Sequence, residues 1–116
     1  MTVTLVGYKI SARSILKWAY ETRRLDKSDL QLSEEDRFRG AYNQARELIE
    51  DTDEGVSLRM LGESNVAKCD YMVAINEYFF DHSGDTEEDH HREVKRALEE
   101  HGFKDLEFKV WKKSSR

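Results

Sequence analysis

The segment 81–94, with the sequence DHSGDTEEDHHREV, concentrates residues that can bind metals or transfer protons. It holds six Asp or Glu residues and three of the four histidines of the chain. Imidazole and carboxylate groups form many metal sites, and they also act as general acids and bases. Acidic residues are equally typical of a helix start, where free backbone N–H groups attract negative charge. The spacing of the residues has to decide among these roles.

A Glu-x-x-His motif occurs twice in this segment, as Glu87 with His90 and as Glu88 with His91. Di-iron helical bundles use such motifs because residues three apart lie on one helix face. Here the two motifs overlap on one helix and point in different directions, so only a homodimer could complete a site. His101 lies ten residues beyond His91, about 15 Å along a helix axis, and cannot share its metal. We expect no metal, with Glu87, His90 and His91 as the only candidates.

Calcium binding is not expected either. Segment 81–92 places oxygen side chains at alternate positions, as an EF-hand loop does. It has Thr86 where that loop needs glycine, and Arg92 where it needs a bidentate glutamate. The segment 51–55 fails for similar reasons. No cofactor is therefore expected.

Other catalytic signatures are weak. Cys69 is the only cysteine, and lone cysteines at strand starts are more often inert packing than nucleophiles. The glycines stand apart and form no phosphate-binding loop, and no G-x-S-x-G elbow occurs. The sequence therefore favours a non-catalytic protein. A small enzyme with a His/carboxylate site at His82, His90 or His91 stays as an alternative.

The acidic segment is best explained as the start of a helix. Asp85 can cap the helix while Glu88 reaches back to it, which satisfies two free amides. Glu88 and Arg92 are four apart and can form an ion pair. Gly102 can end the helix in a left-handed conformation. The pattern predicts a helix over 86–101.

The elements that must position these side chains follow from hydrophobic periodicity. The order is strand, two helices, two strands, helix and strand. It predicts an α+β, ferredoxin-like split βαβ sandwich over the single domain 1–116, with a four-stranded, mainly antiparallel sheet. In that plan the last strand lies beside the first. The other expected elements are strands at 2–10, 56–61, 70–80 and 106–111, and helices at 12–24 and 34–51, which begin after Ser11 and Ser33.

Two strands are apolar on both faces. Three helices on one side of the sheet would bury one face and expose the other; the alternative is that one helix of the long crossover covers the second face. The residues expected under the helices are Val3, Leu5, Val73, Ile75, Leu106, Phe108 and Val110. The opposite face would carry Val6, Tyr8, Met72, Ala74, Tyr78 and Trp111. Exposed apolar faces usually mark interaction sites, and large aromatics dominate interface energy. The leading interpretation is an interaction module that dimerises or binds a protein partner through Val6, Tyr8, Met72, Tyr78 and Trp111.

The net charge is −5, with an uneven distribution along the chain. Both ends are basic, which leaves a second interpretation, a binder of an anionic ligand or nucleic acid. Its candidate residues are Lys9, Arg13, Lys17, Arg24, Lys109, Lys112 and Lys113, with Arg116. The acidic middle could instead mimic nucleic acid and inhibit a protein that binds it. The residues for that third interpretation are Asp51, Asp53, Glu54, Asp81, Asp85, Glu87, Glu88 and Asp89.

The chain shows no signal peptide and no apolar run near eighteen residues. Its single cysteine allows no internal disulfide. We expect a soluble cytoplasmic protein without a membrane partner.

Overall fold

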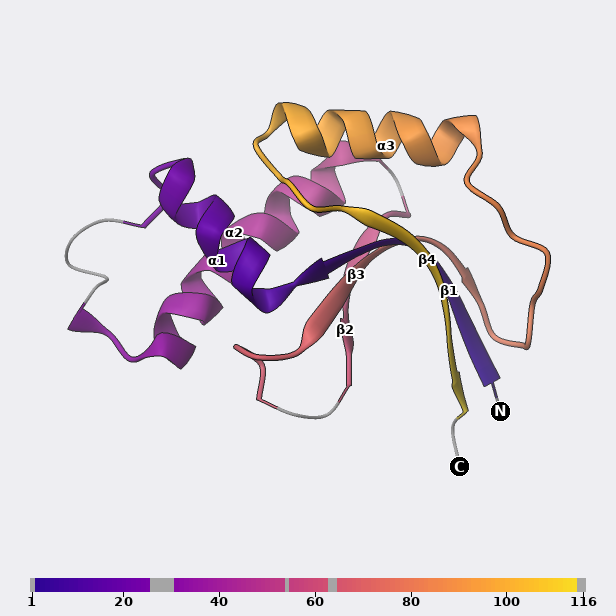
Figure 1. The fold of residues 1–116 in the computed structure, drawn as a ribbon, viewed down its shortest axis with the longest axis horizontal. Helices are drawn as coiled ribbons and strands as arrows, with labels where there is room; N and C mark the ends of the chain where they lie inside the picture. Colours follow the sequence, from indigo (N-terminus) through magenta and orange to yellow (C-terminus); the bar gives the residue numbers. More distant parts are fainter. Residues whose placement is uncertain (1, 26–30, 54, 63–64, 115–116) are drawn as a thin grey trace.

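The computed structural model describes residues 2–25, 31–53, 55–62 and 65–114. A four-stranded antiparallel sheet carries three helices (Figure 1), which confirms the α+β class expected from the sequence. Along the chain the elements are β1 (Thr2–Ser11), α1 (Ala12–Glu21), α2 (Glu34–Thr52), β2 (Ser57–Leu61), β3 (Asp70–Tyr78), α3 (Asp89–Glu100) and β4 (Glu107–Ser114). No helix in the described part of the chain has both the length and the hydropathy needed to cross a membrane.

The strand order is β2-β3-β1-β4, so β1 is central and β4 forms one edge. β1 pairs antiparallel with β4 along its length, from Thr2 opposite Ser114 to Lys9 opposite Glu107. Its pairing with β3 shifts between Val6 and Gly7. A Cβ atom at Gly7 would lie 1.9 Å from the carbonyl oxygen of Val73, so only glycine fits this close approach.

Side-chain caps start the first two helices where the sequence predicts them. The Ser11 hydroxyl accepts the backbone N–H of Ser14 at 3.1 Å, and the Ser33 hydroxyl accepts that of Asp36 at 3.2 Å. α1 ends at Glu21, earlier than predicted, because Arg23 adopts a left-handed conformation with φ 58°.

All three helices pack on the same side of the sheet, where they share one core with β1, β2 and β3. Trp18 is the largest buried side chain. Its ring stacks on Phe103 at 4.3 Å between centroids, and its indole N–H donates to the carbonyl oxygen of His101 at 2.9 Å. Gly102 has φ 96°, as its position after a helix predicts. No helix of the described chain covers the other sheet face, which we call the open face.

The expected assignment of β1 residues to the two faces is wrong. Tyr8 and Ile10 belong to the core under the helices, and alternation places Val6 with them. Leu5 instead packs on the open face, with Val3 against it. Apolar residues occupy both faces of this strand, so alternation alone does not say which face is covered. Lys9 shares the face of Val3 and Leu5, and this charge was the available signal that the face reaches water.

Candidate interaction surface

Segment 81–94 is held to the sheet by a polar network. The Tyr8 hydroxyl donates to the Glu87 carboxylate at 2.7 Å. Burial, together with this hydrogen bond, raises the pKa of Tyr8 well above its usual value. The same hydrogen bond lowers the pKa of Glu87. Glu87 also lies 3.4 Å from the guanidinium of Arg92. Tyr8 therefore anchors the loop before α3 and is not part of an open surface.

His91 completes this network inside the protein, with only 2% of its surface exposed. Its Nδ1 atom accepts the backbone N–H of Glu88 at 3.0 Å, while the Glu88 side chain accepts the backbone N–H of His91. Nε2 lies 2.8 Å from the side-chain oxygen of Asn76, so it carries the proton. Burial, followed by the nearby His90, lowers the pKa of His91. The imidazole is thus a neutral helix cap.

Glu88, not Asp85, is the N-cap of α3, and the helix begins later than the sequence suggested. The reason is that Asp85 is already bonded to His82, with Nδ1 and Oδ2 2.5 Å apart. Arg92 pairs with Glu87 and Asp89 rather than with Glu88. The segment does start a helix, as the sequence predicts, but the reciprocal cap is formed by Glu88 and His91 instead of Asp85 and Glu88.

Two of the three metal candidates lie together: the rings of His90 and His91 are 3.9 Å apart between centroids, and their Nε2 atoms lie 3.5 and 2.8 Å from the side-chain oxygen of Asn76. The Glu87 carboxylate is instead bonded to the Tyr8 hydroxyl. Within the described residues, no group of three or more His, Cys, Asp or Glu side chains could hold a metal ion. Cys69 is buried, with its sulfur 3.8 Å from the carbonyl oxygen of Val66.

The open face buries its own apolar residues. Leu5, Met72 and Ala74 are 5%, 0% and 2% exposed, although no helix lies over them. The partly buried side chains of Val3, Leu61 and Trp111 pack against them. Ion pairs border this cluster, with Lys9 3.4 Å from Asp70 and Arg59 2.9 Å from Glu77. An exposed apolar patch around Met72, as the sequence suggested, is therefore wrong: Met72 is covered, and Val6 and Tyr8 lie on the other face.

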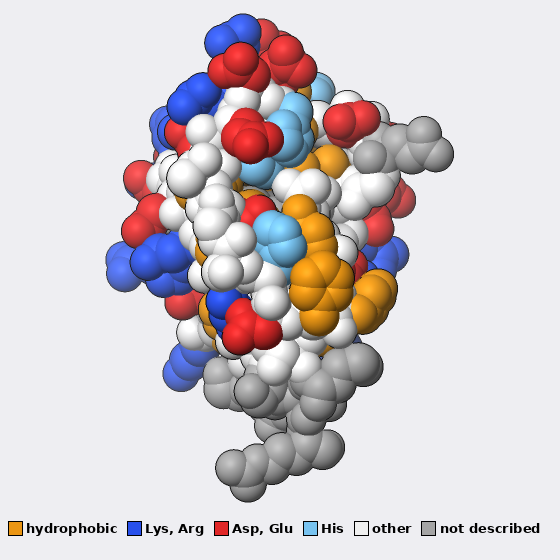
Figure 2. Space-filling model, turned by 90° about the vertical axis from the view of Figure 1, so that its right-hand side faces the viewer, with side chains coloured by type: hydrophobic (Ala, Val, Ile, Leu, Met, Phe, Trp, Pro, Cys, Tyr) orange, Lys and Arg blue, Asp and Glu red, His pale blue; other side chains and the backbone are white. Residues whose placement is uncertain are grey.

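The exposed aromatic residues lie instead at the end of β3. Phe79 is 66% exposed and Phe80 is 57% exposed. Tyr78 stacks on His82 at 3.9 Å between ring centroids, with the rings nearly parallel. Figure 2 shows hydrophobic side chains beside a histidine on this side of the molecule. Sequence reasoning missed both phenylalanines because it continued the strand through them. The adjacent DHSGD turn was the signal that the strand was ending.

β4 is exposed along most of its length. Val110 is 37% exposed, although it is an apolar residue in the middle of a strand. Glu107, Lys109, Lys112 and Lys113 are also exposed. Edge strands carry unpaired backbone groups that can pair with another strand, and lysines often discourage this. We call residues 107–113 the β4 edge.

The structure does not gather the candidate basic residues into one patch. Lys9 pairs with Asp70, Lys17 lies 3.9 Å from Glu21, and Lys112 pairs with Asp81. Arg13 and Lys17 are on α1, Lys9 is on β1, and the other candidate lysines are on β4. The guanidinium of Arg24 lies 5.0 Å from the centroid of the Trp18 ring, and Lys109 is 3.4 Å from Glu107. Lys113 is exposed at the end of β4.

The acidic candidates are divided as well. Asp51 and Asp53 lie at the end of α2. Asp81, Asp85, Glu87, Glu88 and Asp89 lie before and at the start of α3. Glu54 and Arg116 lie outside the described residues.

Comparisons of the chain with models of protein families, with curated proteins and with solved structures found no match. Function has to be argued from the geometry of this molecule.

Proposed function

We propose that this protein is a small non-catalytic interaction module that forms a homodimer by antiparallel pairing of two β4 edges. The observation that carries the proposal is the charge pattern around Val110. Glu107 and Lys113 lie three residues on either side of this exposed apolar residue. A two-fold axis through Val110 places each Glu107 opposite Lys113 of the second copy.

The rest of this register is also favourable. A two-fold axis perpendicular to the sheet preserves its faces, so directly opposed residues must point to the same side. Val110 then faces Val110 of the second copy, and Lys109 faces Trp111, where an ammonium group can lie over the indole ring. An axis through Trp111 would oppose Lys109 with Lys113, and an axis through Lys109 would oppose two lysines. Like charges directly opposite are destabilising, so the Val110 register is favoured over these two.

Trp111 is the interface anchor in this arrangement. It packs on the open-face cluster of its own chain and lies at the border with the second copy. Met72 lies beneath this surface, and Tyr78 is near the exposed phenylalanines on the other face. Edge pairing of one short strand buries less area than a standard interface. The expected dimer is therefore weak and concentration dependent.

The fold assignment supports the same proposal. The order β2-β3-β1-β4 and the antiparallel pairing of β1 with β4 fit the ferredoxin-like split βαβ plan. That plan leaves the last strand at an edge, so pairing would join two sheets into one of eight strands. The paired basic residues argue against nucleic acid as the partner. The buried free thiol of Cys69 fits a reducing compartment, and we propose the cytoplasm.

Cross-linking tests the register. Cβ atoms of directly opposed residues are about 5 Å apart, close to the separation in a disulfide. Val110→Cys should therefore form a covalent dimer under mild oxidation. Lys112→Cys is the matched control, because two copies of residue 112 would be about 13 Å apart along the strands. Equal cross-linking of the two variants would refute the register.

Charge reversal tests the contact itself. Glu107→Lys or Lys113→Glu alone should abolish the dimer measured by sedimentation velocity, and the double variant should restore it. A protein that stays monomeric at every concentration would refute the proposed function.

A further inference from the structure

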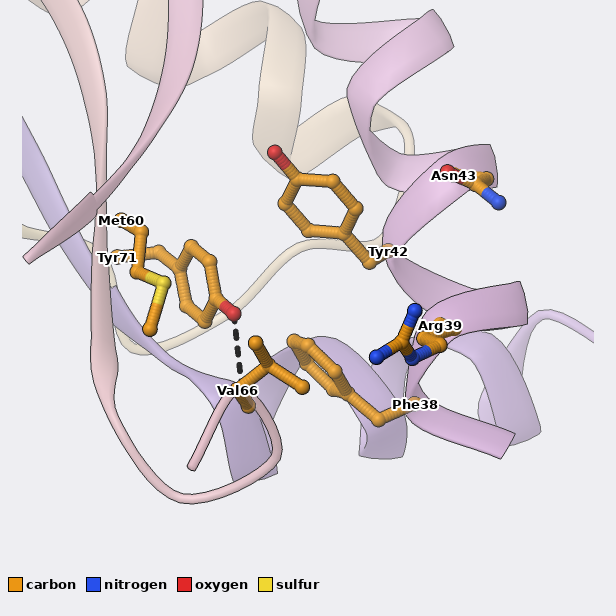
Figure 3. Close-up of a pocket in the computed structure, with 7 residues that line it drawn as sticks. All are labelled: Phe38, Arg39, Tyr42, Asn43, Met60, Val66 and Tyr71. Carbon is orange, nitrogen blue, oxygen red and sulfur yellow. Dashed lines mark hydrogen bonds between the residues drawn. The ribbon is translucent and has the colours of Figure 1, made fainter. Parts of the chain in front are cut away.

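A pocket of about 320 Å³ lies between α2 and the β2–β3 side of the sheet (Figure 3). β2 is the edge strand opposite β4, so this pocket is separate from the proposed dimer interface. Its lining residues come from α2, from β2 and β3, and from the segment between these strands: Phe38, Arg39, Tyr42, Asn43, Met60, Val66 and Tyr71.

Aromatic rings form the walls of the pocket. Tyr42 is on one side, Phe38 and Val66 are on the other, and Tyr71 lies toward the sheet (Figure 3). The Tyr71 ring centroid is 5.5 Å from that of Phe38 and 5.4 Å from that of Tyr42. Phe38 and Tyr71 are almost completely buried, so they form a fixed floor. The accessible walls are therefore Tyr42, Met60 and Val66, and a planar aromatic ring placed there can gain an offset or edge contact with Tyr42.

The polar groups of the pocket lie on its outer side. The Tyr71 hydroxyl is occupied, because it donates to the carbonyl oxygen of Val66 at 2.8 Å. Arg39 and Asn43 are exposed and one helical turn apart on α2. The guanidinium of Arg39 lies beside Phe38 (Figure 3), and a hydrogen bond to Glu35 raises the pKa of Arg39. A guanidinium whose present partner is an exposed carboxylate thus lies next to an aromatic cavity.

We propose that this pocket binds a small aromatic carboxylate. The ring would lie against Tyr42 and Met60, over the buried Phe38 and Tyr71, and the carboxylate would accept two hydrogen bonds from Arg39. The volume is sufficient, because a cavity of about 150 Å³ already takes benzene. Arg39 can change partner at small cost: its 2.9 Å pair with Glu35 is exposed to water, and such pairs contribute little. Asn43 offers an additional amide donor at the same rim.

The charge at the rim distinguishes this ligand class from a neutral aromatic one. Benzoate and benzyl alcohol have similar rings, but only benzoate can form the bidentate contact with Arg39. The probes are therefore these two compounds. Each is titrated into the full chain while backbone amide chemical shifts are followed by NMR.

Benzoate should give saturable shifts around Tyr42, Met60 and Tyr71, and benzyl alcohol should bind more weakly. Arg39→Gln should weaken benzoate binding by about fivefold or more, as loss of a charge-assisted bidentate contact requires. Arg46→Gln is the matched control: Arg46 is an exposed α2 residue that pairs with Glu50 at 3.7 Å and does not line the pocket, so binding should be unchanged.

Three results would overturn the proposal. The first is the absence of saturable shifts at these residues up to the solubility limit of benzoate. The second is equal binding of benzoate and benzyl alcohol. The third is a loss of affinity that is the same for Arg39→Gln and Arg46→Gln. None of these results depends on whether the protein dimerises, so the pocket and the β4 edge are tested separately.

Discussion

The two faces of the sheet bury their apolar residues by different means. Under the helices, Trp18 and the side chains around it form a thick core in which whole elements exclude water. On the open face, Leu5, Met72 and Ala74 are buried just as completely, yet only side chains of the same sheet lie over them. Trp111 and the aliphatic stems of charged residues form this thin layer.

The difference shows that two residues with equally low exposure can contribute unequally to the free energy of unfolding. A residue under a helix is surrounded on all sides, whereas one under a single tryptophan depends on that side chain. Equivalent truncations on the two faces should therefore have unequal effects on the free energy of unfolding.

Truncation of Trp18 should give the largest effect. Trp18→Ala removes a ring stacked on Phe103 and leaves a cavity that neighbouring helices cannot fill. We expect a loss of about 3–5 kcal/mol in the free energy of unfolding, measured by urea denaturation followed by circular dichroism. If Trp18→Ala lowers the free energy of unfolding less than Trp111→Ala does, the helix-covered face contributes less to stability than the open face.

Truncation of Trp111 should cost less in folding and more in association. Because the side chain is only partly buried, Trp111→Ala should lower the free energy of unfolding by about 1–2 kcal/mol. It should weaken the dimer by about 2 kcal/mol, since it removes the anchor of the β4 edge. Denaturation and sedimentation of the same sample separate the two effects. A folding loss equal to that of Trp18→Ala would show that Trp111 belongs to a core.

The helix-covered face should be the one that responds to mild acid. The pKa of His91 is lowered in the folded protein, so the neutral imidazole is favoured by folding and protonation favours the unfolded chain. The contribution of His91 to the free energy of unfolding should be at its maximum above about pH 6.5, the usual pKa of histidine. It should fall as the pH drops from there toward the lowered pKa of the folded protein. The charged groups around the imidazole are His90, Glu88, Glu87 and Asp85.

His91→Gln provides the matched variant for this titration. A glutamine at this helix position can still accept the backbone N–H of Glu88, as in a capping box, but it does not titrate. Its unfolding free energy should decrease less between pH 7 and pH 5.5 than that of the parent. An identical pH profile for the two proteins would exclude His91 as the source.

The smallest effect should come from the ion pairs of the open face. Lys9 and Met72 are directly opposed on neighbouring strands, so the aliphatic stem of Lys9 covers the methionine. Lys9→Met keeps this cover and should change the unfolding free energy by no more than about 0.5 kcal/mol. Lys9→Ala should cost about 1 kcal/mol, because it uncovers Met72. If Lys9→Met and Lys9→Ala lower the melting temperature equally, the charge of Lys9 stabilises the protein and its aliphatic stem does not.

Much of the architecture could be predicted because local signals agree with the tertiary structure. Ser11 and Ser33 cap the helices they precede, and Gly102 ends α3 with a positive φ. The periodicity of α2 predicted its range almost to the residue. In each case the cause lies within a few residues of the effect.

The candidate site could not be predicted to the same extent because it depends on contacts distant in sequence. Tyr8 and Glu87 are 79 residues apart, and the sequence offers no sign that they meet. Asp85 was the better N-cap by residue type, but His82 takes its carboxylate. The pocket beside Tyr42 joins a helix to a strand edge, so no local pattern reveals it.

The central position of β1 also has a consequence for biosynthesis. β1 is translated before its hydrogen-bonding partners β3 and β4, and Thr2 pairs with Ser114 at the other end of the described chain. A strand that is apolar on both faces must therefore wait until about sixty further residues have been translated before β3 can shield it. Such non-local pairing slows folding and leaves nascent chains open to aggregation. A chaperone that holds β1 during translation would protect a vulnerable segment of this protein.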